Sequence, residues 1–256
     1  MSLNAFAMDL LNLLNVPERC RIGQRITKKV FLENARATSA EKKLVRDSVK
    51  EMTILASFSA ATVNIAAYED EHEVYEEVLM LEVVVETEVV AKRAASILQK
   101  SIPYHMVVWL RCGDRLLLNL ALKQVNQVEP EKRVVGEMLF TDWMEYGTAA
   151  SSPDGLFVSL RVEKLPHENL KVFYDGMVCG LIGKQVEAVT GRPKLVCLTG
   201  KVMVVHMLEQ LREVNEQLVT LYGAVKNETQ FNRKVEMNMQ IKLLEAKRDE
   251  LQRGLS

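Results

Sequence analysis

The chain of 256 residues is 48% hydrophobic and 26% charged, with a formal net charge of −1. This composition excludes an intrinsically disordered chain, and the near-zero charge excludes a general electrostatic attraction to nucleic acid or to an anionic surface. Any such affinity must come from a local patch, and the length predicts one main domain with an appendage.

The first sixty residues predict two helices and a strand. Apolar residues at 3–14 recur every three or four positions, which is typical of an amphipathic helix, and Pro17 would stop it. A Thr or Ser cap at 38–39, followed by Glu41, predicts a second helix to about residue 50. The apolar run at 52–59 then predicts a short strand.

The middle third has the clearest pattern, because apolar runs of strand length alternate with one helical pattern. A strand, a helix, a hairpin and a strand are predicted in turn at 75–86, 87–102, 104–125 and 132–143. Gly113 marks the hairpin turn. The predicted helix turns one apolar face inward, made of Val89, Val90, Ala94, Ile97 and Leu98. This β-α-β-β-β order predicts an α+β fold with a mixed or antiparallel sheet covered by helices.

Both faces of this sheet are expected to be covered, because its strands are nearly continuous in apolar residues and do not alternate. The N-terminal helices and the helical pattern at 170–189 are the candidates for the second cover. We therefore predict a core domain at 1–200.

The C-terminal segment at 201–256 changes character and predicts coiled-coil-like helices. Apolar residues recur every seven positions, and further apolar residues stand four positions after some of them, as in the seam of a coiled coil. The seam residues, which we predict to mediate oligomerisation, are Val204, Leu208, Leu211, Leu218, Tyr222 and Val225. A polar stretch at 226–234 interrupts the pattern before it resumes at Met237, so a helical hairpin and one long arm both fit.

Charge is segregated within the chain. Residues 17–50 contain ten Lys or Arg against four acids, a net of +6, whereas residues 69–88 contain nine acids and no Lys or Arg. The candidate residues for contact with nucleic acid or with an acidic partner are Arg21, Gln24, Arg25, Lys28 and Lys29. The alternative is a solvated edge strand or loop whose apolar face lies on the core, made of Ile22, Ile26, Val30 and Leu32.

Catalytic and metal-binding patterns are missing from the sequence. No His lies within three to five residues of another His or of a Cys, and "GLIGKQ" at 180–185 departs from a phosphate-binding loop in spacing and in its helical context. A nuclease of the restriction-enzyme type would need a carboxylate two residues before Lys123, where Ala121 stands, to join Asp114. We predict no catalytic residue, no metal site and no cofactor.

The expected compartment is a reducing cytoplasm. Cys20, Cys112, Cys179 and Cys197 are scattered without a CxxC pair, which predicts free thiols. The N-terminal apolar stretch lacks the basic region of a signal peptide. No apolar run reaches about 18 residues, so no membrane span is predicted.

Several stretches carry a family resemblance: "CRIGQRITKKVFLENA", "SAEKKLV", the hairpin "IPYHMVVWL…LLLNLALKQVNQ", "FTDW" and "LPHENL". Together they resemble an uncharacterised bacterial family, domain of unknown function four-three-nine-one, over almost the whole chain. The resemblance implies a place beside helicase and DNA methyltransferase genes in restriction-like phage-defence clusters. Where that family is expected to have a proline after "IPY", this chain has His105.

The function expected from these observations is that of a non-catalytic accessory protein. It would bind a protein partner, such as a helicase or a methyltransferase, or a second copy of itself, through its C-terminal helices. One alternative is a DNA-binding adaptor that uses residues 19–50. A metal-dependent nuclease with an unrecognised site is the less favoured alternative.

Overall fold

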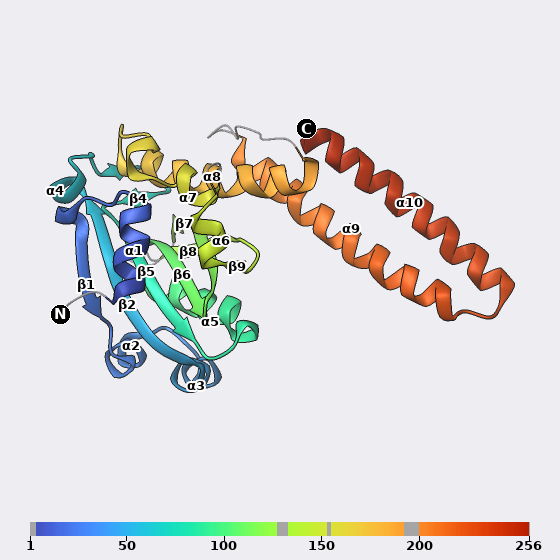
Figure 1. Ribbon diagram of the computed structural model, residues 1–256, viewed down its shortest axis with the longest axis horizontal. Helices are drawn as coiled ribbons and strands as arrows, with labels where there is room; N and C mark the ends of the chain where they lie inside the picture. The colour runs from blue at the N-terminus through green and yellow to red at the C-terminus, as the bar shows by residue number, and fades with distance from the viewer. Residues whose placement is uncertain (1–3, 127–132, 153–154, 192–199, 256) are drawn as a thin grey trace. The chain divides into compact units, whose positions relative to one another are not determined.

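The computed structural model describes residues 4–126, 133–152, 155–191 and 200–255. Contacts between Cα atoms divide the chain into two compact units, Met1–Val178 and Cys179–Ser256. The first unit contains the β-sheet and the second contains two long helices (Figure 1). The α+β class predicted from the sequence is confirmed.

A mixed sheet forms the centre of the first unit. Its order among the described strands is β1-β2-β5-β6-β7-β8, with β9 paired to β7. Among the described strands of this sheet, β5 and β6 are the one parallel pair, and the other neighbours are antiparallel. The strands are β1 (Arg21–Arg25), β2 (Val49–Ser59), β5 (Glu77–Val85), β6 (His105–Cys112), β7 (Arg115–Val125), β8 (Arg133–Phe140) and β9 (Met144–Glu145). A separate two-stranded sheet pairs β3 (Tyr68–Glu69) with β4 (Val74–Tyr75).

Short helices surround the sheet. In the first unit these are α1 (Ala5–Leu13), α2 (Lys28–Asn34), α3 (Ser39–Ser48), α4 (Ala60–Val63), α5 (Glu88–Ser101), α6 (Tyr146–Ala150) and α7 (Leu156–Ser159). Two 3₁₀ turns, η1 (Glu18–Cys20) and η2 (Val162–Lys164), lie between them. The long helices are α8 (Leu170–Thr190), which crosses the division between the units, α9 (Lys201–Asn227) and α10 (Phe231–Leu255).

The predicted β-α-β-β-β order is found as β5-α5-β6-β7-β8. Helix α5 supplies the crossover that a parallel strand pair requires. Gly113 takes φ +59° between β6 and β7, a left-handed conformation that glycine adopts without steric cost. The predicted inner face of α5 is wrong at Val89, which lies in the first turn with 90% of its surface exposed. Ala91 and Ala95 face the core there.

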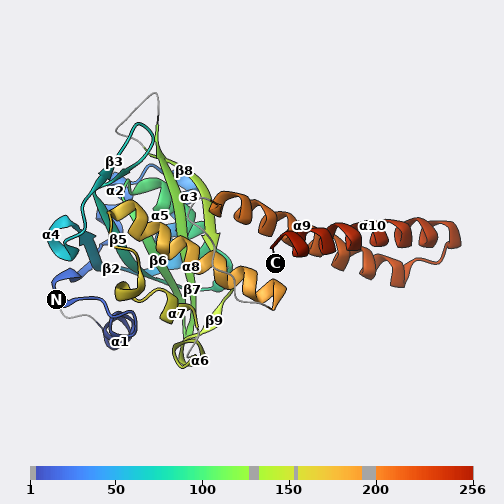
Figure 2. The same ribbon diagram turned by 90° about the horizontal axis from the view of Figure 1, so that it is seen from above.

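Helices cover both faces of the sheet, as predicted. Helices α2, α3 and α5 lie on one face, whereas α1, α7 and the start of α8 lie on the other (Figure 2). Alternate residues of β5 follow this division: Leu81 and Val83 join the core under α2, α3 and α5, and Glu82 points to the α1 face. The tyrosine hydroxyl of Tyr174 in α8 bonds to the backbone of β6 and β7 from the second face.

The C-terminal helices form a hairpin, which decides between the two arrangements that fitted the sequence. Helix α10 runs back along α9 (Figure 1). The connection lies at residues 228–230, where the Glu228 carboxylate accepts the backbone N–H groups of Thr229 and Gln230, both at 2.8 Å. Helix α9 begins where the predicted C-terminal segment begins, and the division into compact units falls earlier, inside α8.

Candidate interaction surfaces

The basic segment contributes an edge strand to the sheet, followed by a helix. Strand β1 pairs with β2 and is the last strand on its side among those described. Its ladder has a bulge between Arg21 and Gln24, where Gly23 takes φ +67°. Ile26 and Leu32 pack against the core as expected, whereas Ile22 and Val30 are exposed. The buried apolar residue of α2 is Phe31.

The five candidate residues of this segment have different partners. The Arg21 Nε donates to the Val16 carbonyl at 2.9 Å, and Arg25 pairs with Glu51 at 3.2 Å. The Lys28 ammonium donates to two backbone carbonyls, those of residues 46 and 49, at 2.8 Å each. Gln24 and Lys29 are exposed. Lys28 is therefore used within the fold, and binding of nucleic acid or an acidic partner by the set stays a prediction.

A larger basic surface, which sequence reasoning missed in part, lies on the outside of α2, α3 and α5. We call it the basic layer. Its exposed cations are Lys29, Arg36, Lys43, Arg46, Lys92, Arg93 and Lys100. Of the four acids of these helices, Glu33 is exposed, whereas Glu41 pairs with Arg93, Asp47 with Arg46 and Glu88 with Arg115. The remaining cations therefore dominate the field at this surface.

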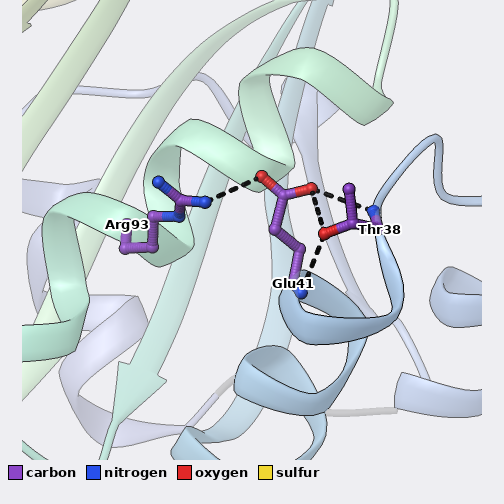
Figure 3. A network of polar contacts seen from close by, with 3 residues as sticks. All are labelled: Thr38, Glu41 and Arg93. Atoms are coloured by element: carbon purple, nitrogen blue, oxygen red, sulfur yellow. Dashed lines mark hydrogen bonds and ion pairs between the residues drawn. The ribbon is translucent and has the colours of Figure 1, made fainter.

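Helices α3 and α5 are joined at this surface by a capping network (Figure 3). The Glu41 carboxylate accepts the Thr38 N–H at 2.9 Å and the Thr38 hydroxyl at 3.1 Å, and Thr38 Oγ1 accepts the Glu41 N–H at 3.2 Å. Arg93 of α5 donates to the other carboxylate oxygen at 3.2 Å. The Thr38 hydrogen bonds lower the pKa of Glu41, with a smaller effect from Arg93. This network fixes the N-terminus of α3 against α5.

Residues 70–73 of the acidic stretch form a loop between β3 and β4, and its later acids lie in or beside β5 and at the start of α5. The Asp70 carboxylate accepts the N–H groups of His72 and Glu73, and Glu73 pairs with Lys171 of α8. The hydrogen bond from the Tyr68 hydroxyl is the first cause of a lowered pKa at Asp70. A depression of about 650 Å³ lies beside this loop. Asp70 is therefore committed to the turn and Glu73 to Lys171, whereas Glu71 is exposed.

The inner seam of the hairpin matches the predicted heptads in part. The buried residues of the two helices are Val205, Leu211, Val214, Leu218, Ile241, Leu251 and Leu255. Of the six predicted seam residues, Leu211 and Leu218 are buried, whereas Val204, Leu208 and Val225 are half-buried. Tyr222 is exposed, and its hydroxyl donates to Glu245 across the hairpin at 2.6 Å. Oligomerisation through the predicted set stays a prediction.

The outer side of α10 carries a second apolar row that the heptad pattern did not identify. Phe231, Val235, Met239 and Leu243 follow one another at four-residue steps, and between 42% and 77% of each residue's surface is exposed. We call these four residues the outer row. Leu243 also lines a groove of about 660 Å³ between α9 and α10, whose α9 wall includes Glu213 and Glu216.

The polar residues considered for a nuclease do not converge. Lys123 is buried, and its ammonium donates to the carbonyls of Ile102 at 2.7 Å and Tyr104 at 2.6 Å. Asp114 lies in the exposed β6–β7 turn. Among the described residues, no group of three His, Cys, Asp or Glu side chains could hold a metal ion. The "GLIGKQ" stretch lies inside α8, in the helical context predicted for it.

A buried ion pair holds the start of α1 on the sheet. Glu82 of β5 accepts Arg111 Nε at 2.7 Å and Asn4 Nδ2 at 3.2 Å. Asn4 is also the N-cap of α1, where its side chain accepts the Ala7 N–H at 2.7 Å. Because each group has a partner, the pair acts as a structural anchor.

Cysteine placement gives no sign of a shared site. The Cys20 thiol is buried and donates to the Thr62 carbonyl at 3.5 Å, and burial is the first cause of its raised pKa. The Cys112 thiol lies 3.7 Å from the Glu86 carbonyl. Cys197 lies outside the described residues.

Comparison with protein-family models matches residues 14–247 to the family described as Domain of unknown function (DUF4391). No curated protein and no solved structure matches the chain. In the parts of the chain that the structure describes, no helix has both the length and the hydropathy needed to cross a membrane.

Proposed function

The chain belongs to the DUF4391 family, and from this premise we propose that it is a non-catalytic accessory protein of a bacterial helicase or methyltransferase-type phage-defence system. Its task is to bind another polypeptide through the α9–α10 hairpin. The outer row is the observation that carries this proposal, because four large apolar side chains stand together in water on one helix. Contiguous apolar surface of this kind marks interaction sites.

Burial of the outer row would contribute measurably to binding, but its free energy is too small to offset the whole cost of association. Complete burial of a side chain of this size stabilises by about 1.5–3 kcal/mol, so the exposed fractions of the four amount to about 4–8 kcal/mol. Association costs about 4–15 kcal/mol in translational and rotational freedom. A stable complex therefore needs a partner that also contacts the neighbouring groove.

Co-purification tests this proposal. The tagged full-length chain should retain the helicase or methyltransferase encoded beside it, and the variant Met239→Glu with Leu243→Glu should not retain it. The matched control is Arg212→Glu, which changes the net charge by the same amount at an exposed position of α9. A role for the outer row would be contradicted if the double variant still retained the partner. It would also be contradicted if Arg212→Glu lost the partner and the double variant did not.

The basic layer supports a second candidate function, that of a DNA-binding adaptor. Its exposed cations come from three helices on one face of the sheet, and each phosphate that they neutralise would release counterions. The test replaces Lys29, Arg36, Lys43 and Lys100 by Ala, because these four cations are exposed. This variant should flatten the dependence of DNA affinity on salt by about 0.9 in log–log slope for each phosphate that is no longer neutralised.

The control for this experiment replaces four Lys or Arg residues of α10 by Ala and keeps the basic layer. Fluorescence anisotropy of labelled duplex DNA measures both. An absence of binding by the wild-type chain at about 50 mM salt would exclude this function, because the attraction between cations and phosphates is strongest at low salt.

A further inference from the structure

We propose that the basic layer binds the phosphate backbone of duplex DNA without reading the base sequence. The proposal rests on the DNA-binding function given above and names the form of DNA that this surface accepts. Three features of α2, α3 and α5 carry it: their unpaired cations, the engagement of the side chains that could recognise bases, and the burial of their one aromatic ring.

Helices α3 and α5 lie antiparallel, which spreads the cations of the basic layer over one surface. Arg93 of α5 donates to Glu41 near the start of α3 (Figure 3). At the other end of α3, the Ser48 carbonyl accepts the N–H of Glu86, just before α5. Two cations of the layer pair with acids of the same surface. In the part of the chain that the structure describes, the five that form no ion pair are Lys29, Arg36, Lys43, Lys92 and Lys100.

The composition of the basic layer suits DNA better than an acidic protein. The centres of protein–protein interfaces are depleted in Lys, whereas protein–DNA interfaces are strongly positive. Four of the five unpaired cations are lysines, and the large exposed apolar residues, Val30 and Val89, lie on different helices. Between Lys92 and Lys100 the helix rises about 12 Å, a length over which a duplex carries about seven phosphate charges. The three helices therefore offer cations for a phosphate chain in place of an apolar centre for a protein.

The side chains of these helices that could read bases are already engaged. The Asn34 amide, which could pair with adenine, donates to a carbonyl of its own helix at 2.8 Å, and Gln99 is buried. Arginine recognises guanine through two parallel hydrogen bonds, but Arg46 and Arg93 are paired with acids, which leaves Arg36. Lysine acts as a point charge and suits a phosphate. The layer therefore holds the backbone and leaves the base edges unread.

The aromatic content of these helices favours a duplex over a single strand. Proteins that bind single strands stack the bases on exposed aromatic rings. The three helices contain one aromatic residue, Phe31, and its ring is buried. A duplex also presents twice the charge of a single strand, one phosphate for about every 1.7 Å of its axis. The surface therefore matches the charge of a duplex and has no ring to offer an unstacked base.

Fluorescence anisotropy of the full-length chain with labelled DNA at about 50 mM salt tests this mode of binding. Two duplexes of unrelated sequence and equal base composition should bind within about 3-fold of each other, and each more tightly than its separated strands. The slope of log affinity against log salt should be no steeper than about −4.5, the value for five phosphates. Recognition of bases would instead separate the two duplexes by more than about 10-fold.

Glu33 allows a test in the direction of tighter binding, which a misfolded variant does not produce. This exposed acid lies one turn after Lys29. Glu33→Lys should strengthen duplex binding by about 2- to 5-fold and steepen the salt slope by up to about 0.9, because it removes a repulsion and adds a contact. The matched control, Glu236→Lys, makes the same change of charge at an exposed position of α10 and should have a smaller effect.

The outcomes separate the inference from the function on which it rests. A difference above about 10-fold between the duplexes, or tighter binding of a single strand, overturns the inference and leaves DNA binding in place. Equal gains from Glu33→Lys and Glu236→Lys overturn the assignment to the basic layer. Displacement of the duplex by polyglutamate as effectively as by unlabelled duplex of equal charge would assign the layer to an acidic protein. A wild-type chain that binds no DNA overturns the inference and the DNA-binding function together.

Discussion

Lys28 distinguishes a structural role from a binding role within the basic segment. Its ammonium donates to the carbonyls of Arg46, in the last turn of α3, and of Val49, which follows it. Carbonyls at a helix end lack partners within the helix, and a cation there also opposes the negative end of the helix dipole. We expect Lys28→Met to lower the free energy of unfolding, whereas Lys29→Met on the same helix should not.

The magnitude follows from the two hydrogen bonds. A hydrogen bond to a charged group contributes about 1.5–3 kcal/mol when protected, and one of these two is exposed to water. We therefore expect a decrease of about 2 kcal/mol. In a unit of this size, that corresponds to a fall of about 4–8 °C in the melting temperature. Both substitutions remove one positive charge from the first turn of α2, so the Lys29 variant corrects for that change.

Urea unfolding followed by tryptophan fluorescence is the appropriate assay, because Trp109 and Trp143 both lie in the first unit. The two variants should share the same slope with denaturant and differ in midpoint. Equal midpoints would refute the structural role of Lys28. In the DNA assay the order should reverse: Lys29→Met should reduce the salt slope and Lys28→Met should leave it unchanged.

Three further outcomes are expected from other polar residues. Glu82→Gln should cost about 3–5 kcal/mol in urea unfolding by leaving Arg111 without its partner, and Arg111→Met in the same chain should restore much of it. The pKa of Glu41 is lowered, so the ionised carboxylate stabilises the folded state. The stability difference between wild type and Glu41→Gln should be fully present above the unperturbed pKa of about 4.5 and should disappear as the pH falls through the lowered pKa. A difference that grows at acid pH would contradict this. Plasmid DNA incubated with the protein and Mg²⁺ or Mn²⁺ should stay intact, and cleavage that Asp114→Asn abolishes would support a nuclease instead. Lys123→Met should lower the free energy of unfolding, because the Lys123 ammonium donates to two backbone carbonyls.

The central fold could be predicted because its signals are local. The runs that became β5, β6 and β7 are apolar over strand length, and Gly113 stands at the one position where the chain must turn with positive φ. Thr38 is the N-cap of α3, one of the two residues that the sequence offered, and Glu41 lies in the first turn as expected. Val89 was misplaced although the helix start was predicted to within one residue, because an apolar residue in the first turn of a helix can point outward.

The candidate surfaces were harder to predict because they depend on distant contacts. The carbonyl partners of Lys28 lie 18 and 21 residues away, and Arg93 meets an acid 52 residues earlier in the chain. The outer row was present in the sequence as a four-residue repeat from Phe231 to Leu243. The seven-residue repeat predicted only the inner seam. Which side of α10 stays exposed depends on its packing against α9, and the sequence left the hairpin and the single arm both open.

The bulge in β1 has a consequence for the behaviour of the protein at high concentration. A regular strand at the border of a sheet offers a row of backbone groups to which another chain can add, and this is a common route to aggregation. Here Gly23 interrupts that row, and the charged side chains of Arg21 and Arg25 flank it. A substitution that straightens the strand, such as Gly23→Val, should expose a template for fibril growth that the native chain avoids.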